Sequence, residues 1–158
     1  MRKILIAITV FLYLLSGNAS AQVQPTAQLR GKIYDEYKSL EAALQKTKDT
    51  ALIFSLRDTC MITIVQLDAY ITMIGMMDSV RDKGLNKGTI DYIVLWLNEM
   101  RRTNDLNIKN LALPREMQKD TQVHSENMMR YFNELRTYAD TELRKLAKLQ
   151  ELLDKAKK

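Results

Sequence analysis

The side chains that could support catalysis are few in this 158-residue sequence, and they match no known catalytic pattern. It has one histidine, His124, and one cysteine, Cys60. A di-iron bundle needs two Glu-x-x-His pairs, but the residue three positions before His124 is Thr121. Covalent haem attachment needs two cysteines, and Ser125 lacks the glycine-rich turn of a serine nucleophile. We therefore expect no enzyme activity, no metal and no cofactor.

The methionines offer one further route to a cofactor. His124, expected to be exposed or partly packed, could bind haem non-covalently together with a methionine from another helix. The methionines recur at helical spacing, as Met61, Met73, Met76, Met77, Met100 and Met128. Such spacing is more typical of core filling or of an adaptable binding surface.

An interaction surface is the more specific expectation for these residue types. Tyr92 and Trp96 lie one helical turn apart, and an exposed pair of this kind suits a protein partner. The alternative is that Trp96 packs against a neighbouring helix. The candidate partner surface comprises Tyr92, Trp96, Met73, Met76 and Met77.

Cys60 and Asp68 lie in the most apolar stretch of the mature chain, Ala51–Val80. Cys60 is on its main apolar stripe, which predicts a buried thiol; the alternative is a disulfide between two copies of the chain. Burial would raise the pKa of Asp68. Its position between two stripes instead predicts a boundary residue paired with a lysine or arginine.

Those two stripes indicate how the stretch is covered. The main stripe contains Ile53, Leu56, Cys60, Ile64, Leu67, Ile71 and Ile74, and the second contains Phe54, Ile62, Val65, Ala69, Met73, Met76 and Val80. A helix that is apolar on two sides needs cover on both, from neighbouring helices, a partner chain or lipid. A mid-bilayer carboxylate such as Asp68 costs roughly 3 kcal/mol or more. We therefore expect a buried bundle helix enclosed by protein on more than one side.

The N-terminal residues have the pattern of a secretory signal peptide. Arg2 and Lys3 precede the apolar run Ile4–Leu15, and Ala19-Ser20-Ala21 forms a small-residue cleavage site. The pattern predicts a signal peptide at 1–21 and a periplasmic or extracellular protein at 22–158. The mature part would carry a net charge of (24 − 2) − 19 = +3 with mixed signs, which does not favour nucleic-acid binding.

Helical periodicity predicts four helices in one domain, at about 26–47, 50–83, 89–112 and 115–157. Gln22–Pro25 is expected to be a loose leader, with Thr26 as the first helix cap. A slip in the apolar phase at Lys46–Thr50 separates the first two helices, and Pro114 separates the last two. We expect an all-α antiparallel four-helix bundle. The end of its long C-terminal helix would form a charged coiled-coil flank or contact a membrane surface.

Three segments resemble a known family. They are DSVRDKGLNKG, IDYIVLWLNEMRRTNDLNIKNL and HSENMMRYFNELRTYAD, within about residues 60–140. With the signal peptide and the long apolar helix, their layout resembles the exported helical subunits of conjugative type IV secretion machines of Bacteroidota. The pattern contains no diagnostic motif, and the chain is shorter than such subunits. The resemblance implies a structural role at a secretion channel or pilus, and no functional residue is transferred from it.

The expected function is that of an exported, non-enzymatic structural or interaction protein of the cell envelope, as a component of a conjugative apparatus. Its partners would be envelope proteins or a second copy of the chain. The alternatives are a periplasmic chaperone-like helical protein and a ligand- or haem-binding bundle.

Overall fold

The protein is an all-α four-helix bundle, as the sequence predicts. A computed structural model describes residues 19–80, 87–113 and 116–156, with the side chains at 19–25, 75–80, 153 and 156 left out of the description. It contains α2 (Ala19–Ala43), α3 (Thr50–Val80), α4 (Lys87–Leu111) and α5 (Lys119–Ala156). No β-strand occurs among the described residues.

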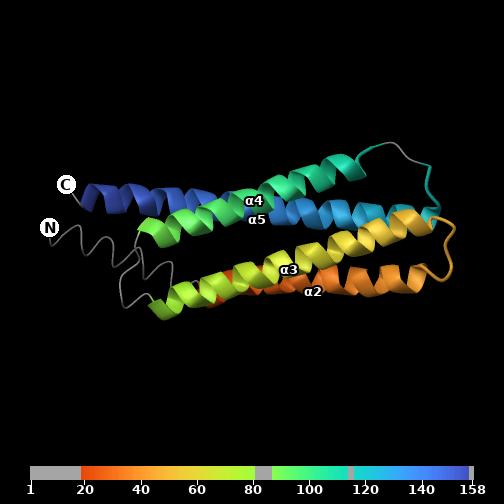
Figure 1. Cartoon of the computed structure of the whole chain (residues 1–158), viewed down its shortest axis with the longest axis horizontal. Helices are drawn as coiled ribbons and strands as arrows, with labels where there is room; N and C mark the ends of the chain where they lie inside the picture. The colour runs from red at the N-terminus through yellow and green to blue at the C-terminus, as the bar shows by residue number, and fades with distance from the viewer. Residues whose placement is uncertain (1–18, 81–86, 114–115, 157–158) are drawn as a thin grey trace.

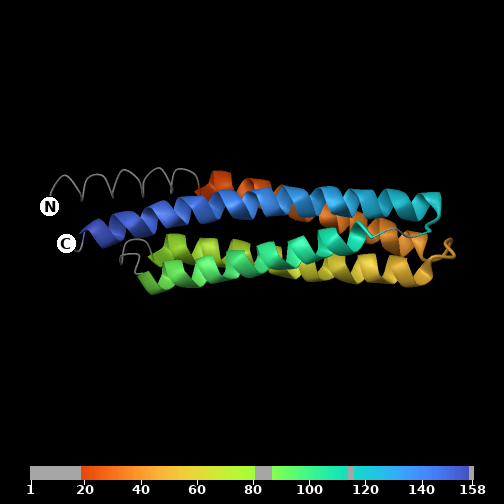
Figure 2. The same ribbon diagram turned by 90° about the horizontal axis from the view of Figure 1, so that it is seen from above.

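The helices run up and down in sequence order and form an elongated molecule (Figures 1 and 2). The α2–α3 and α4–α5 connections lie at the same end. Helix α2 packs along α3, and α4 packs along α5, so the molecule consists of two helical hairpins. The hairpins meet mainly where α2 lies beside α5. Contacts of α3 with α4 and α5 are sparser.

One continuous hydrophobic core runs between the hairpins. Helix α3 contributes the main stripe that the sequence predicts, with Ile53, Cys60 and Leu67 fully buried. Facing positions at the usual three- and four-residue steps come from the other helices: Ile33 and Leu40 in α2, Ile90, Ile93, Leu97 and Met100 in α4, and Met128, Phe132, Leu135 and Ala139 in α5. Each large aliphatic side chain stabilises the fold by about 1.5–3 kcal/mol through burial.

Helix α2 begins earlier than the sequence predicts. It starts at Ala19, so the backbone at Gln22–Pro25 is helical rather than a loose leader, and Thr26 lies inside the helix instead of capping it. Pro25 removes one backbone hydrogen bond, but its fixed φ angle is compatible with a helix. Thr26 is buried. The predicted signal peptide falls largely on residues 1–18, outside the described part of the chain.

The two connections at one end of the bundle are hydrogen-bonded to each other. Helix α2 ends at Ala43, and the predicted break before Thr50 is present. The Asp49 carbonyl accepts the amide of Ile53, which places Asp49 at the cap of α3. Its carboxylate accepts a hydrogen bond from the backbone N–H of Gln118 at 2.7 Å. The Thr47 hydroxyl donates to the side-chain oxygen of Gln118 at 2.9 Å.

Helices α3, α4 and α5 keep the predicted order with shifted ends. Helix α5 begins at Lys119 rather than near 115. It starts directly after Gln118, whose backbone N–H donates to the Asp49 carboxylate. The predicted last turn of α3 and the turn at Gly84 and Gly88 fall mostly on residues 81–86, outside the described residues. Gly88 itself is helical, because α4 starts at Lys87.

Candidate functional site

The outer side of α3 is the main apolar surface in the described structure. Four large apolar side chains lie on it: Phe54, Ile62 and Val65 of the second stripe, and Met61 beside them. We call these four residues the outer α3 face. Ile62 and Val65 are 56% and 62% exposed. The expectation that protein covers both sides of this helix is therefore not met within a single chain: the main stripe is buried from Ile53 to Leu67, and Phe54, Ile62 and Val65 of the second stripe are exposed. The bundle forms regardless, since the main stripe alone supplies α3's part of the core.

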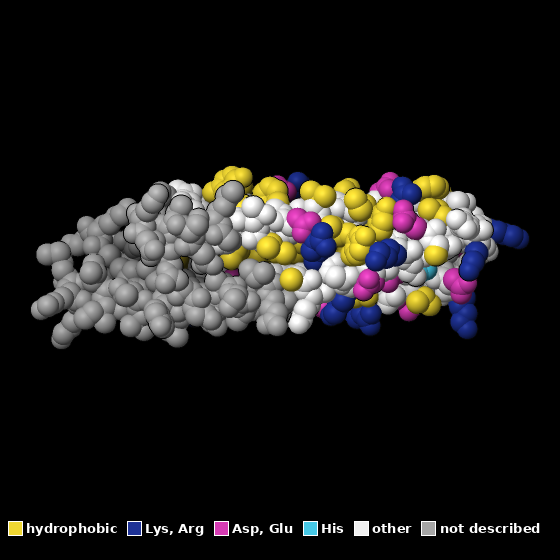
Figure 3. Space-filling model, turned by 90° about the horizontal axis from the view of Figure 1, so that it is seen from below, with side chains coloured by type: hydrophobic (Ala, Val, Ile, Leu, Met, Phe, Trp, Pro, Cys, Tyr) yellow, Lys and Arg dark blue, Asp and Glu magenta, His cyan; other side chains and the backbone are white. Residues whose placement is uncertain are grey.

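Aromatic and cationic side chains of α2 lie near Arg57 of α3, which interacts electrostatically with Tyr37. The Tyr34 and Tyr37 rings are stacked with their centroids 6.3 Å apart, and the Lys38 ammonium lies 4.4 Å from the Tyr34 ring centroid. On α3, the Arg57 guanidinium lies 4.7 Å from the Phe54 ring centroid. Exposed tyrosine, phenylalanine and arginine are residue types enriched at protein interfaces. Figure 3 views the α2–α3 side, where hydrophobic side chains gather between patches of both charges.

The carboxylates beside the outer α3 face are neutralised within the chain. Arg30 of α2 donates to both oxygens of Asp68, with Nη2 2.9 Å from Oδ2. This confirms the predicted pairing of Asp68. The hydrogen bond from Arg30 lowers the pKa of Asp68. Arg57 donates to Asp58 at 3.0 Å. The surface therefore combines apolar side chains with little net charge.

Helix α3 also has the length and the apolar composition of a membrane-spanning helix. Among the described residues it is the one helix to do so, over Thr50–Ile74, and a third of its most apolar window is buried inside the chain. The core helix of a water-soluble bundle has the same properties. Asp68 of this segment is bidentately paired with Arg30 of α2, and the two charges would be costly inside a bilayer.

The predicted partner residues with described side chains, Tyr92, Trp96 and Met73, differ in exposure. Tyr92 is well exposed on α4, whereas Trp96 packs partly buried against the core with its indole nitrogen enclosed. The two therefore do not make an exposed aromatic pair. Met73 is partly buried against the core. Met76 and Met77 lie on α3, and their side chains are outside the described part of the structure.

A buried polar cluster joins α2 to α5. The Glu36 carboxylate contacts His124 Nδ1 through one oxygen, and its other oxygen accepts the Asn127 amide at 3.1 Å. The His124 and Glu36 side chains are only 12% and 7% exposed. Sequence reasoning missed Glu36, although it lies three residues after Ile33 and four before Leu40 on the buried side of α2. This three- and four-residue spacing indicates that Glu36 shares the buried side of the helix with these two residues.

A pocket of about 280 Å³ lies beside this cluster, at the end of the bundle that carries the two connections. Its lining includes Lys46, Gln118, Asp120, Thr121 and His124. The Thr121 and Thr47 hydroxyl oxygens are 3.5 Å apart, so these hydroxyls interact with each other. Both signs of charge line the pocket, and no nucleophile is hydrogen-bonded to His124 among the described contacts. The pocket therefore does not define a reaction.

The Cys60 thiol is enclosed in the core, as the sequence predicts. It is fully buried, with its sulfur 3.2 Å from that of Met128. Burial, with a smaller contribution from Glu36, raises the pKa of Cys60 to about 12. Such a thiol is poorly nucleophilic at neutral pH. A disulfide between two copies would require the helices around it to separate.

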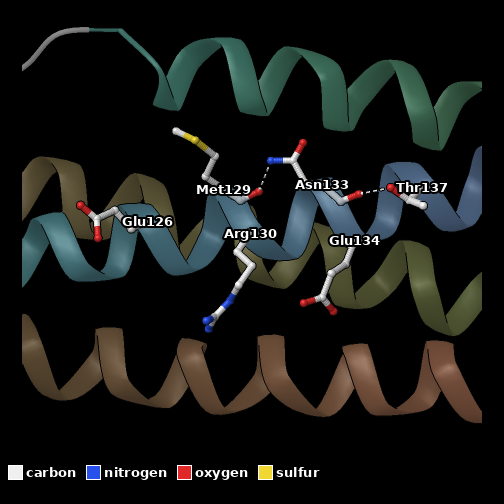
Figure 4. A pocket seen from close by; sticks show the side chains of 6 residues that line it. All are labelled: Glu126, Met129, Arg130, Asn133, Glu134 and Thr137. Atoms are coloured by element: carbon white, nitrogen blue, oxygen red, sulfur yellow. Dashed lines mark hydrogen bonds between the residues drawn. The ribbon is translucent and has the colours of Figure 1, made fainter.

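A larger open depression of about 710 Å³ follows one side of α5 (Figure 4). All the residues that line it belong to this helix: Glu126, Met129, Arg130, Asn133, Glu134 and Thr137. Asn133 and Thr137 donate to backbone carbonyls of α5 itself, and Glu134 accepts from Lys32. Since these polar groups are already paired within the chain, the depression offers no convergent set of catalytic groups.

Within the described residues, no group of three or more histidine, cysteine or acidic side chains is arranged to hold a metal ion. Comparison of the chain with protein families, with curated proteins and with solved structures finds no match.

Proposed function

We propose that the protein is a non-enzymatic interaction protein of the cell envelope and that it binds its partner through the outer α3 face. The observation that supports this most strongly is the exposure of Ile62 and Val65 on a helix whose opposite side forms the core. Clustered apolar surface of this kind commonly marks an interaction site. The nearby Tyr34, Phe54 and Arg57 add residue types that often contribute most of the binding energy.

The described titratable groups fit a structural role better than a catalytic one. Cys60 is enclosed in the core, and Asp68 is occupied by Arg30. His124 is engaged by Glu36. Each of these contacts joins two helices, so each stabilises the bundle. Location in the envelope is supported by the signal-peptide pattern of residues 1–21, and the resemblance to conjugative secretion subunits suggests such an apparatus as the setting.

Site-specific photo-crosslinking in the producing cells tests this proposal. A photoreactive amino acid at Ile62 or Val65 should give discrete adducts with envelope proteins. The same photoreactive amino acid at Leu95 on α4 is a matched control, because Leu95 is 63% exposed but has the acidic residues Asp91 and Glu99 one helical turn away on either side. Equal adducts from all three positions, or none from Ile62 and Val65, would contradict the proposed surface.

A chaperone that holds unfolded clients would use the same apolar face. An aggregation-suppression assay separates the two roles, because a structural subunit should not protect a denatured client protein. Suppression that is lost in an Ile62→Arg variant would favour the chaperone role.

A further inference from the structure

We infer that the outer α3 face binds a second copy of the same chain, with the two α3 helices antiparallel about a twofold axis. This inference rests on the proposed function, since it names the occupant of the same surface. In a symmetric dimer the same patch must be complementary to itself. The residue order along α3 and the charge pairs beside it can each be tested against that requirement.

The order of side chains along α3 is compatible with an antiparallel self-pairing. With the axis halfway between Ile62 and Val65, Ile62 of each chain faces Val65 of the other. Phe54 then faces Met73, and Asp58 faces the small Ala69. Bulky side chains thus meet flexible or small ones along the helix. This matching is what close packing of two helices requires.

Charge also favours the antiparallel arrangement. Two parallel, in-register helices would bring Asp58 against its own copy, and Asp58 is well exposed. Like charges in direct opposition are destabilising. In the antiparallel arrangement each Asp58 meets Ala69 and keeps its own Arg57 at 3.0 Å. Asp68 likewise remains paired with Arg30, so the two faces meet without net repulsion.

The size of the surface indicates a weak, reversible interface. The 25 residues Thr50–Ile74 span about 37 Å at 1.5 Å per residue, and a helix is about 12 Å wide. Two such strips would bury about 900 Å² in total, which is at the low end of specific interfaces. Interfaces this small are typical of weak, transient association, so we expect a reversible dimer and take a dissociation constant on the order of 10 µM for the test.

Disulfide trapping with single cysteine variants tests the geometry, using chain purified after export. In the antiparallel dimer the two copies of position 62, or of position 65, are offset by about 4.5 Å along the axis, whereas the two copies of position 54 are about 28 Å apart. Ile62→Cys and Val65→Cys should therefore form dimers on mild oxidation, and Phe54→Cys should not. A mixture of Phe54→Cys with Met73→Cys should give the mixed dimer.

The unmodified chain is the control for Cys60, which should form no disulfide because it is buried. Dimers of Phe54→Cys alone, in the yield of Ile62→Cys, would overturn the antiparallel arrangement. Circular dichroism melting of each variant verifies that it is folded, and all four substituted side chains are at least partly exposed.

Sedimentation velocity tests the association itself. The weight-average mass should rise with protein concentration, and Ile62→Arg should weaken association at least about tenfold by placing a charge at the axis. Leu95→Arg on α4 is the matched control and should leave association unchanged. A single monomeric species up to about 300 µM overturns the inference, because a 10 µM dimer would be almost fully formed there.

Other occupants give distinct results. Chain that stays monomeric but still gives envelope adducts from Ile62 supports the proposed function and overturns the dimer. Chain that stays monomeric and floats with phosphatidylcholine vesicles, with flotation lost in Ile62→Arg, assigns the face to lipid and also overturns the dimer.

Discussion

The inner and outer sides of α3 are built from similar side chains but lie in different surroundings. Ile53 and Leu67 on the inner side are fully buried, and Ile62 and Val65 on the outer side are more than half exposed. The difference comes from the positions of the other helices, because α2, α4 and α5 all approach α3 from the inner side. Hydrophobicity alone therefore does not decide which apolar residues form the core of this bundle.

The outer side of α4 also contains exposed apolar residues and can be compared with the outer α3 face. Tyr92 and Leu95 are as exposed as the residues of the outer α3 face, but charged side chains separate them from other apolar residues. Asp91 accepts from Gln150, and Arg102 donates to Glu99 on the same helix. Isolated apolar residues among charges are ordinary protein surface. The contiguous, nearly neutral surface of α3 is the unusual feature.

Thiol reactivity should show the largest difference between the two sides of α3. An Ile62→Cys variant contains one inner and one outer cysteine. At pH 8 the outer thiol should react rapidly with an aromatic disulfide reagent. Burial raises the pKa of Cys60 to about 12, so this thiol should react only when the fold opens. For a free energy of unfolding of 5 kcal/mol or more, its reaction should be at least about 10³-fold slower than that of the outer thiol. Equal rates would show that the inner side is not enclosed.

Truncation of apolar side chains should separate the two sides by several kcal/mol. Leu67→Ala removes a fully buried side chain and should lower the free energy of unfolding by about 2–5 kcal/mol, because a cavity remains in the core. Val65→Ala, two residues earlier on the outer side, should change it by less than about 0.5 kcal/mol at concentrations where the chain is monomeric. Urea denaturation measures both. A comparable loss in the two variants would contradict the observed burial.

The Glu36 cluster is a buried polar contact between α2 and α5 on the inner side of the bundle. Glu36→Ala should lower the free energy of unfolding by about 1–3 kcal/mol, because it leaves His124 Nδ1 and the Asn127 amide without their partner in buried surroundings. Asp35→Ala changes an exposed neighbour on the same helix and should have little effect. An unchanged stability of Glu36→Ala would mean that the cluster contributes no net stabilisation.

The Arg30–Asp68 pair at the margin between the two sides should have the smallest effect. Its side chains are 37% and 49% exposed, so Asp68→Asn should cost at most about 1 kcal/mol at neutral pH. The pKa of Asp68 is lowered in the folded state. The pair therefore stabilises the fold above the unfolded-state pKa of about 3.9, and this contribution is lost as the pH falls through the folded-state value.

Denaturation at a series of pH values checks the Asp68 prediction. The stability difference between the unmodified chain and Asp68→Asn should vanish toward low pH. Asp58→Asn, which removes a carboxylate paired with its neighbour Arg57 on the same helix, is the matched comparison variant. A difference that grows at low pH would contradict the assigned direction.

Local pattern was sufficient for part of the site. The position of Asp68 between two stripes predicted a boundary ion pair, and that of Cys60 predicted a buried thiol, because helical periodicity fixes which residues share a side. The burial of Trp96 and Glu36 was harder to predict from helical periodicity. Both lie near the edge of a stripe, where a rotation of the helix by a fraction of a turn decides between core and solvent. That rotation depends on the neighbouring helices.

The sequence by itself determined that four helices form, that breaks lie between α2 and α3 and between α4 and α5, and that the main stripe of α3 enters the core, because these follow from spacing and turn residues along one segment. Only the tertiary structure decided that Glu36 meets His124, that Arg30 is the partner of Asp68, and that the second stripe of α3 is left outside. Each of these depends on how two helices distant in sequence are placed against each other, and no local pattern encodes that placement.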